Sequence, residues 1–271
     1  MHNPIEKCLQ SAQVLWNRPQ GSGYFCMGLG CGGYIQGAEP GQFLMVRLEG
    51  QQFPLLRRPF SIHRVIMNQG RVNGFEILYK VVGTGTALMA GAKKGDGISV
   101  LGPLGKSFDL HPGHKTFYFA AGGIGVAPFL FLADRMAAAG FDMSRQNLFL
   151  GGRTANDLLC VTDFENLGLP THLTTDDGSR GRPGLVTGPL EEAIGTSPPD
   201  MVYACGPLPM LREVMTIAAN HDLPCQVSIE TIMACGMGAC LGCAVKDKQR
   251  NDAYRHACVD GPVFNADEIV L

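Results

Sequence analysis

Four cysteines near the end of the sequence constrain this chain more than any other feature. Cys235, Cys240, Cys243 and Cys258 follow the order Cys-x4-Cys-x2-Cys, with the last cysteine fourteen intervening residues later. This is the ligand spacing of a plant-type [2Fe–2S] cluster. Residues 234–243 hold three glycines and two alanines, so that backbone N–H groups can approach the sulfurs. The pattern predicts a protein that transfers electrons one at a time.

Two other interpretations of the four cysteines stay open. A structural zinc site usually pairs two Cys-x-x-Cys units, whereas only Cys240 and Cys243 form such a unit in this motif. Disulfides are disfavoured, because residues 1–7 show no basic-then-apolar signal region and no apolar run approaches the roughly 18 residues that span a bilayer. We therefore expect a reducing compartment, the cytoplasm, and no membrane partner.

Six cysteines lie outside the motif. Cys26 and Cys31 repeat half of its spacing in a glycine-rich stretch, but no Cys-x-x-Cys stands beside them. We interpret this pair as loop cysteines and not as metal ligands. The other four are Cys8, Cys160, Cys205 and Cys225.

Composition limits the class of protein and of partner. The 271 residues suffice for two domains and a small appendage, and 45% hydrophobic with 17% charged residues describe a globular chain. Lysine and arginine number 22 against 24 acidic residues, which gives a formal net charge of −2. No basic surface for nucleic acid or anionic membrane is indicated.

The first part of the chain, residues 1–110, has the pattern of an antiparallel β-barrel or sandwich. Apolar or β-branched runs at 42–48, 75–82 and 97–101 predict short strands separated by glycine. One short helix is expected near residues 87–92.

The next part, residues 111–222, predicts a parallel sheet flanked by helices, because strand and helix patterns alternate. The boundary falls near residues 111–113. Strands are expected at 116–120, 147–150, 171–174 and 201–205, and helices up to about 139, at 185–194 and at 207–220. In residues 223–271 the periodic pattern fades, and the bound cluster is expected to help hold this tail folded.

Three turns at the carboxyl ends of the predicted parallel strands point to a nucleotide. Residues 121–128 form a glycine-rich strand-to-helix turn, where backbone N–H groups favour a pyrophosphate. Residues 205–207 and 175–178 follow later strands at the same edge, and the acidic side chains of the latter suit ribose hydroxyls. The alternatives are a turn that serves tight packing and an exposed acidic turn.

Residues 57–61 and 83–86 are the notable segments of the first part. An arginine neutralises a pyrophosphate, a serine hydroxyl bonds a flavin ring nitrogen, and glycine with threonine can surround a phosphate. Each segment alone is unspecific, since Arg-Arg-Pro is often a surface turn and Gly-Thr-Gly-Thr a plain loop.

The order of these motifs resembles the ferredoxin–NADP reductase superfamily. Arg-Pro-Phe-Ser, Leu-Tyr-Lys, Gly-Thr-Gly-Thr, Leu-Gly-Pro-Leu-Gly, Gly-Gly-Ile-Gly and Cys-Gly-Pro follow one another between residues 58 and 207. Residues 233–243 and 258–264, with the gap between them, narrow the resemblance to the electron-transfer subunits of NAD-dependent dihydroorotate dehydrogenase, the PyrK family. The resemblance runs from about residue 40 to the end.

The resemblance implies three cofactors, FAD, a [2Fe–2S] cluster and NAD, each with its residues. It assigns FAD to Arg58, Pro59, Phe60, Ser61, Leu78, Tyr79, Lys80, Gly85 and Thr86. It assigns the nicotinamide nucleotide to Gly122, Gly123, Gly125, Pro128, Asp176, Cys205, Gly206 and Pro207. The four cysteines of the motif are assigned to the iron–sulfur cluster.

The implied activity is a relay with a partner. An FMN-containing β/α-barrel subunit would oxidise dihydroorotate, and this chain would pass the electrons through the cluster and FAD to NAD+, in a heterotetramer with two copies of each subunit. Two features depart from the family pattern: Thr84 stands where relatives often carry lysine, and residues 21–37 have no counterpart that we can place. The residues alone leave NAD and NADP open, since Arg153, near the end of the second predicted parallel strand, could meet a 2′-phosphate, whereas the resemblance favours NAD. The alternatives are an NAD(P)H–ferredoxin oxidoreductase subunit and a zinc-stabilised redox-sensing binding protein.

Overall fold

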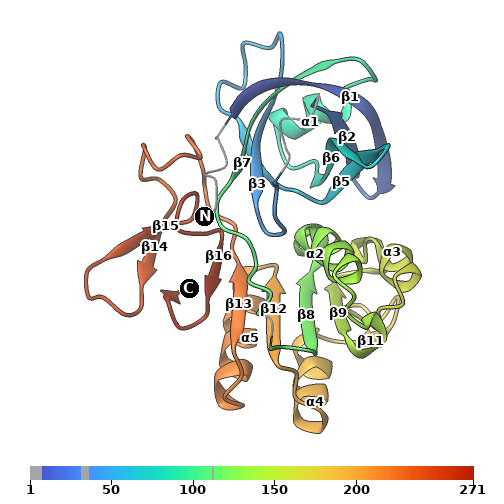
Figure 1. Ribbon diagram of the computed structural model, residues 1–271, viewed down its shortest axis with the longest axis vertical. Coiled ribbons are helices and arrows are strands. Elements are labelled where there is room, and N and C mark those ends of the chain that lie inside the picture. Colours follow the sequence, from blue (N-terminus) through green and yellow to red (C-terminus); the bar gives the residue numbers. More distant parts are fainter. Residues whose placement is uncertain (1–7, 32–36, 112) are drawn as a thin grey trace.

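The computed structural model describes residues 8–31, 37–111 and 113–271, except for the side chain of Cys8. Pro112, at the expected domain boundary, lies outside these ranges. The chain forms two seven-stranded sheets and one three-stranded sheet (Figure 1). Within the described ranges, no helix combines the length and apolar character needed to cross a bilayer.

The first sheet is a curled antiparallel half-barrel in the order β4-β3-β7-β1-β2-β6-β5, as predicted. Phe60 on β4 meets Tyr79 on β6 edge to face, with ring centroids 5.8 Å apart, so the sheet curves back on itself. A short helix, α1, follows β6. The elements are β1 (Cys8–Gly21), β2 (Tyr24–Gly30), β3 (Phe43–Leu48), β4 (Arg58–Ser61), β5 (Arg64–Asn68), β6 (Arg71–Lys80), α1 (Thr84–Ala90) and β7 (Gly97–Leu104).

Two segments of this sheet differ from the sequence-based expectation. Residues 57–61 were open to interpretation as a surface turn, but residues 58–61 form β4, and Pro59 is tolerated there because β4 is an edge strand. The interpretation of Cys26 as a loop cysteine is wrong: it lies on β2, an internal strand between β1 and β6. Cys31 is a buried residue just after β2.

The second sheet confirms the predicted parallel α/β architecture. Its order is β11-β10-β9-β8-β12-β13-β16, and every pair is parallel except the one between β13 and β16. From β8, successive strands run outward in both directions, which places a crevice between β8 and β12. The elements are β8 (Phe117–Gly122), α2 (Ala127–Ala138), β9 (Asn147–Gly152), α3 (Val161–Asn166), β10 (Thr171–Thr175), β11 (Arg182–Pro183), α4 (Thr187–Thr196), β12 (Met201–Cys205), α5 (Leu208–Asn220), β13 (Cys225–Ser228) and β16 (Val263–Asn265).

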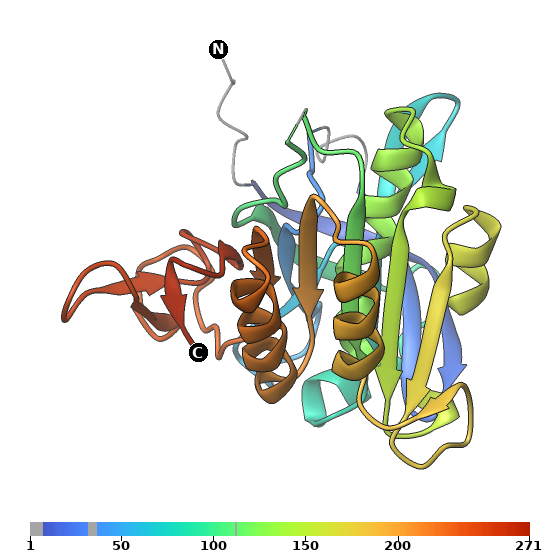
Figure 2. The same ribbon diagram turned by 90° about the horizontal axis from the view of Figure 1, so that it is seen from below.

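Successive side chains of β8 point alternately into two hydrophobic cores. Phe117 and Phe119 pack into the core that contains α2 and α3, whereas Tyr118 and Ala120 pack into the core that contains α4 and α5. Because successive side chains of a strand point to opposite faces, both faces of the sheet are covered by helices (Figure 2).

The tail, residues 223–271, is less separate from the α/β domain than a division between residues 222 and 223 would suggest. β13 and β16, both from the tail, extend the second sheet, so the strand pattern does not end at residue 224. The rest forms a small sheet of β14 (Ala244–Asp247), β15 (Tyr254–His256) and β17 (Ile269–Val270). Val245, Phe264 and Ile269 join the core beneath α4 and α5, and this shared core anchors the tail.

This anchoring predicts a large effect of Phe264→Ala. Phe264 is 1% exposed, and its removal should lower the free energy of unfolding by about 3–5 kcal/mol. Tyr254→Ala, at a side chain in the same tail that is 61% exposed, should change it by about 0.5 kcal/mol or less. Urea unfolding followed by circular dichroism measures both. Equal effects of the two substitutions would contradict the shared core.

Candidate cofactor sites

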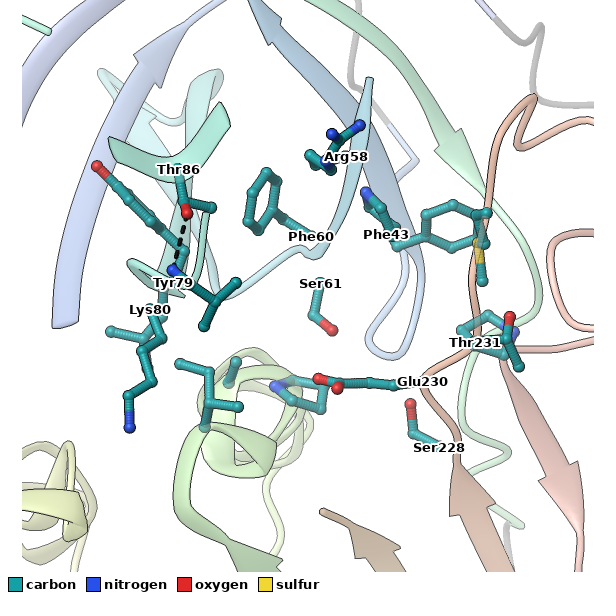
Figure 3. Close-up of a pocket in the computed structure, with 18 of the residues that line it drawn as sticks. Phe43, Arg58, Phe60, Ser61, Tyr79, Lys80, Thr86, Ser228, Glu230 and Thr231 are labelled. Carbon is teal, nitrogen blue, oxygen red and sulfur yellow. Dashed lines mark hydrogen bonds between the residues drawn. The ribbon is translucent and has the colours of Figure 1, made fainter. Parts of the chain in front are cut away.

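A cavity of about 320 Å³, here called the first cavity, opens between the half-barrel and the second sheet (Figure 3). This volume is within the range of small-molecule sites. All nine residues that the sequence assigned to FAD line it. β4 supplies residues 58–61, the end of β6 supplies residues 78–80, and the turn into α1 supplies residues 83–86.

Two of these residues support the wall through hydrogen bonds of their own. The Thr86 hydroxyl accepts hydrogen bonds from the backbone N–H groups of Val82 and Gly83, at 2.9 and 3.2 Å, so it orders the turn. Tyr79 donates its phenolic hydrogen to Asn17, and burial raises the pKa of this phenol to about 12. Thr86 therefore holds the loop in shape, and it also lines the cavity to which the resemblance assigned the FAD pyrophosphate.

The opposite wall of the first cavity comes from residues that sequence analysis missed. Ser228, Glu230, Thr231, Met233 and Pro262 line it, and all of them belong to the tail. The Thr231 hydroxyl is buried and has no hydrogen-bond partner among the described residues. A buried polar atom without a partner is costly, so this cavity wall suits a polar ligand such as a flavin ring. Met233 and Pro262 lie inside the segments that carry the family resemblance, but no motif marks Ser228, Glu230 or Thr231 in the sequence.

A second cavity of about 730 Å³ lies at the carboxyl ends of β8, β9 and β12. Five of the eight residues assigned to the nicotinamide nucleotide line it: Gly122, Gly123, Asp176, Gly206 and Pro207. Pro128 and Cys205 line the first cavity instead. Gly125 lines neither of these two cavities.

The glycines of the β8 turn serve packing as well as access. A Cβ on Gly125 would overlap the carbonyl oxygen of Cys205, and one on Gly122 would lie 2.7 Å from Cδ of Pro207. The turns after β8 and β12 therefore touch without side chains between them, which is the structural interpretation of the motif. Gly122 and Gly123 also line the second cavity, so the packing role leaves this turn accessible to a ligand.

Charged side chains give the second cavity a negative wall. Lys80 and Arg153 line it together with four carboxylates: Asp157, Asp176, Glu213 and Glu230. Sequence analysis missed Asp157, which is 6% exposed and accepts a 2.7 Å hydrogen bond from Tyr24. Burial alone would raise the pKa of this carboxyl, but the bonds from Tyr24 and Thr154 and the nearby cations lower it below its usual value.

The two cavities adjoin. Lys80, Ile124 and Glu230 line both of them, so no complete wall separates the first cavity from the second. The side chain of Glu230 is exposed to the cleft, yet the protein on both sides displaces enough water to raise the pKa of its carboxyl.

The four cysteines of the motif form two pairs. The Sγ atoms of Cys243 and Cys258 lie 3.2 Å apart, and the Cys235 sulfur accepts a hydrogen bond from the backbone N–H of Cys240 at 3.4 Å. No three of the four sulfurs lie within 4.8 Å of one another. Tetrahedral zinc would need all four about 3.8 Å apart, whereas a two-iron cluster takes two thiolates per iron. The arrangement favours [2Fe–2S].

Backbone hydrogen bonds prepare Cys235, in the pair with Cys240, to bind a metal. Burial alone would raise the pKa of Cys235, but N–H groups of the loop, including that of Met237 at 3.4 Å, lower it to about 6. A thiolate is the form that binds iron.

The cysteine loop, residues 234–243, packs directly on the half-barrel. Gly236 has φ +75°, and a Cβ there would overlap Met45 of β3 and crowd Leu104 of β7. Met233, two residues before the first cysteine, lines the first cavity, as does Pro262, four residues after the last. The segment that carries the quartet, residues 233–262, therefore contributes both of its ends to the wall of the first cavity, and in this sense the two sites share a wall.

Comparisons with known proteins agree with this geometry. Residues 230–270 match the model of the iron-sulfur cluster binding domain of dihydroorotate dehydrogenase B, and residues 119–216 match that of the oxidoreductase NAD-binding domain.

Whole-chain relatives carry one description, dihydroorotate dehydrogenase B (NAD(+)), electron transfer subunit. The protein from Caldanaerobacter subterraneus is 41% identical over 86% of this chain and 87% of its own length. The protein from Geobacillus kaustophilus is 39% identical over the same shares.

Solved structures share the fold. The structure of an NADH-dependent reduced ferredoxin-NADP oxidoreductase, studied for flavin-based electron bifurcation, aligns with a TM-score of 0.81 and 27% identity over 96% of this chain and 89% of that one. A ferredoxin NADP+ reductase from Neisseria gonorrhoeae aligns with a TM-score of 0.65 and 17% identity over 79% and 91%.

The paired cysteines predict which thiols hold iron. Cys243→Ser should remove most of the iron and acid-labile sulfide from anaerobically purified protein, because Cys243 is one of the paired thiols. Cys225→Ser is the matched control, since Cys225 is also buried but lies on β13, outside the quartet. It should keep about two irons per chain. Iron and sulfide assays with the visible spectrum measure both, and full iron content in Cys243→Ser would contradict the assignment.

Proposed function

Because this chain belongs to the family of electron transfer subunits of NAD(+)-dependent dihydroorotate dehydrogenase B, we propose that it carries electrons from a dihydroorotate-oxidising partner to NAD+. The observation that carries the proposal is the shared wall. The cysteine quartet, the first cavity and the second cavity follow one another in contact, in the order that such a transfer requires.

Each site suits one cofactor. Cys235, Cys240, Cys243 and Cys258 would hold the [2Fe–2S] cluster. The first cavity would hold FAD, with Arg58 near its phosphates and Ser61 and Thr231 as polar contacts. The second cavity would hold NAD. When bound, the cluster supplies single-electron transfer and the flavin exchanges single electrons for the electron pair that NAD+ accepts.

The protein's own part is placement. Phe60 and Tyr79 pack on each other in the wall of the first cavity, and Thr86 fixes the loop beside them. We assign no side chain of this chain as a general acid or base, since transfer of an electron pair with its hydrogen needs none here.

Dihydroorotate oxidation is assigned to the partner. The described residues form a half-barrel, an α/β domain and a small sheet, none of which is the β/α barrel expected of an FMN-containing catalytic subunit. We propose that this partner docks beside the cluster, in a complex with two copies of each subunit in the cytoplasm. The nine cysteines whose side chains are described are free thiols, which suits a reducing compartment.

An exposed apolar surface near the cysteines supports this docking position. Ile232 is 88% exposed, Leu241 58%, Met237 49% and Val259 40%. All four neighbour the ligand cysteines in sequence, and Cys240 itself is exposed. Apolar side chains gathered in one exposed region mark interaction sites.

A second candidate is an NAD(P)H–ferredoxin oxidoreductase subunit. The alignment over 96% of the chain with a reduced ferredoxin-NADP oxidoreductase favours it. Productive electron transfer with a ferredoxin, and none with an FMN-containing partner, would select this candidate.

The central test compares the lone chain with the complex. Purified holoprotein alone should reduce artificial acceptors with NADH and should not oxidise dihydroorotate. Adding a catalytic subunit from a relative's complex should restore dihydroorotate-dependent NAD+ reduction. Stopped-flow spectra at the flavin and cluster bands follow the transfer. Dihydroorotate turnover by the lone chain would contradict the division of labour.

Surface variants add a control to this test. Leu241→Asp should weaken the complex with the catalytic subunit and leave the reduction of artificial acceptors intact. Met67→Asp, at a 57% exposed side chain on the edge strand β5, should affect neither.

The negative wall of the second cavity predicts preference for NAD over NADP. Four carboxylates and two cations line it, and Arg153 lies 3.7 Å from Asp157. An added 2′-phosphate would therefore meet net repulsion, although Arg153 alone had suggested an NADP contact.

Asp176→Asn should therefore reduce the preference for NADH over NADPH. We expect the ratio of kcat/KM for NADH over NADPH to fall by up to about tenfold, which corresponds to ~1.4 kcal/mol. Steady-state assays with an artificial acceptor measure the ratio. Glu191→Asn, at an exposed carboxylate of α4 that does not line the second cavity, serves as the control. An unchanged ratio in Asp176→Asn would show that Asp176 does not contribute to the selectivity between NADH and NADPH.

A further inference from the structure

A second group of metal-binding side chains lies between the half-barrel and α3, away from the cysteine quartet. One ligand atom each of Cys26, His63 and Glu76 lie within 4.8 Å of one another. The Cys26 sulfur is 3.8 Å from a Glu76 carboxylate oxygen. The Cys160 sulfur lies 3.7 Å from Nε2 of His63. Three potential ligands therefore form one group, and Cys160 reaches it through His63 from a fourth segment, outside the 4.8 Å limit that the other three share.

Strand register brings the first three together. Cys26 on β2 pairs with Leu78, two residues beyond Glu76 on β6, so Cys26 and Glu76 share one face of the sheet as diagonal neighbours. His63 joins them because its backbone N–H bonds the Glu76 carbonyl oxygen at 2.8 Å. Cys160 comes from the α/β domain, immediately before α3, in the left-handed conformation with φ 59°.

His63 has the arrangement of a metal ligand. It is 3% exposed, and its Nδ1 lies 2.7 Å from the carbonyl oxygen of Ala127. A carbonyl only accepts hydrogen bonds, so Nδ1 carries the hydrogen and Nε2 offers its lone pair toward Cys160. A ligating histidine typically donates its other N–H in this way.

The other groups lack the partners that would explain them. Among the described residues, the Glu76 carboxylate accepts one side-chain hydrogen bond, from the Cys26 thiol. Arg64, the neighbouring cation, binds both oxygens of Asp134, at 2.7 and 3.1 Å.

We propose that Cys26, His63, Glu76 and Cys160 form a binding site for one zinc ion, or for another divalent ion that accepts sulfur and nitrogen. In tetrahedral zinc sites the ligand atoms are about 3.5 Å apart. The Cys26–Glu76 distance of 3.8 Å and the Cys160–His63 distance of 3.7 Å are close to this value, and the Cys160 sulfur would move toward Cys26 and Glu76 when the ion binds. Binding releases the two thiol protons. The resulting net charge of −1 faces Arg18 and Arg64, the two cations that act on this group.

The site would join the two larger domains beside strands that also line the cavities. Tyr24, two residues before Cys26, lines the second cavity, and Leu78, two residues after Glu76, lines the first. Cys160 ties this face of the half-barrel to the start of α3. The ion would thus fix the distance between the two cavities.

Elemental analysis tests the site in the full holoprotein, purified anaerobically from cells grown with zinc. We expect about one zinc and about two irons per chain. Cys26→Ser and Cys160→Ser should each lower zinc at least tenfold and leave iron unchanged. Cys31→Ser is the matched control, because Cys31 is a buried thiol of the same sheet outside the group, and it should keep its zinc.

A second measurement does not depend on how well these variants fold. Zinc chloride alone, added to wild-type protein stripped by a chelator, should raise Tm, and Glu76→Gln should reduce this shift. Any of three results would overturn the proposal. Both cysteine variants could retain zinc, or the Tm of stripped wild-type protein could stay unchanged when zinc is added. The third is a Cys26–Cys160 disulfide detected in the intact mass of the anaerobic protein.

Discussion

The contact between the cysteine loop and the half-barrel is the constraint on which the rest of the structure depends. Gly236 lies against the side chains of Met45 and Leu104 with no room for a Cβ, so the loop that carries the cysteines packs closely on β3 and β7 of the half-barrel. Because Met45 and Leu104 are themselves buried, this contact is rigid and not a surface association. The packing therefore sets where the cysteines lie relative to the half-barrel.

The same position is secured from the other side by the second sheet. β13 pairs with β12 in the middle of the α/β domain, and β16 pairs with β13, so the strands that flank residues 235–258, the segment with all four cysteines, both belong to that sheet. Thr231 and Pro262 leave these strands and enter the wall of the first cavity. One sheet therefore holds the nucleotide turns and both ends of the cysteine-bearing segment in a common frame.

The sequence predicted the parts of this arrangement that local chemistry determines. Cysteine spacing, the glycine turn after β8 and the strand–helix alternation each depend on neighbours a few residues apart, and all three were found. β1 and β2 were missed because their polar and apolar residues do not alternate cleanly. Thr231, Asp157 and the group around His63 were missed because they acquire a role only through contacts with distant segments: Tyr24 and Asp157 are 133 residues apart, and His63 and Cys160 are 97 apart.

The meeting of the two cavities explains the uneven distribution of charge around them. Lys80 is the single cation that lines both, and its ammonium group lies 2.9 Å from the Tyr24 hydroxyl and 3.7 Å from Asp157. The positive charge is thereby held at the boundary, where it balances Asp157. If Lys80 were free to swing toward solvent, Arg153 would be the one remaining cation among the described residues that line the second cavity, against four carboxylates that repel a pyrophosphate. The hydrogen bond from Lys80 to Tyr24 thus links the fold of β2 and β6 to the entry of an anionic nucleotide.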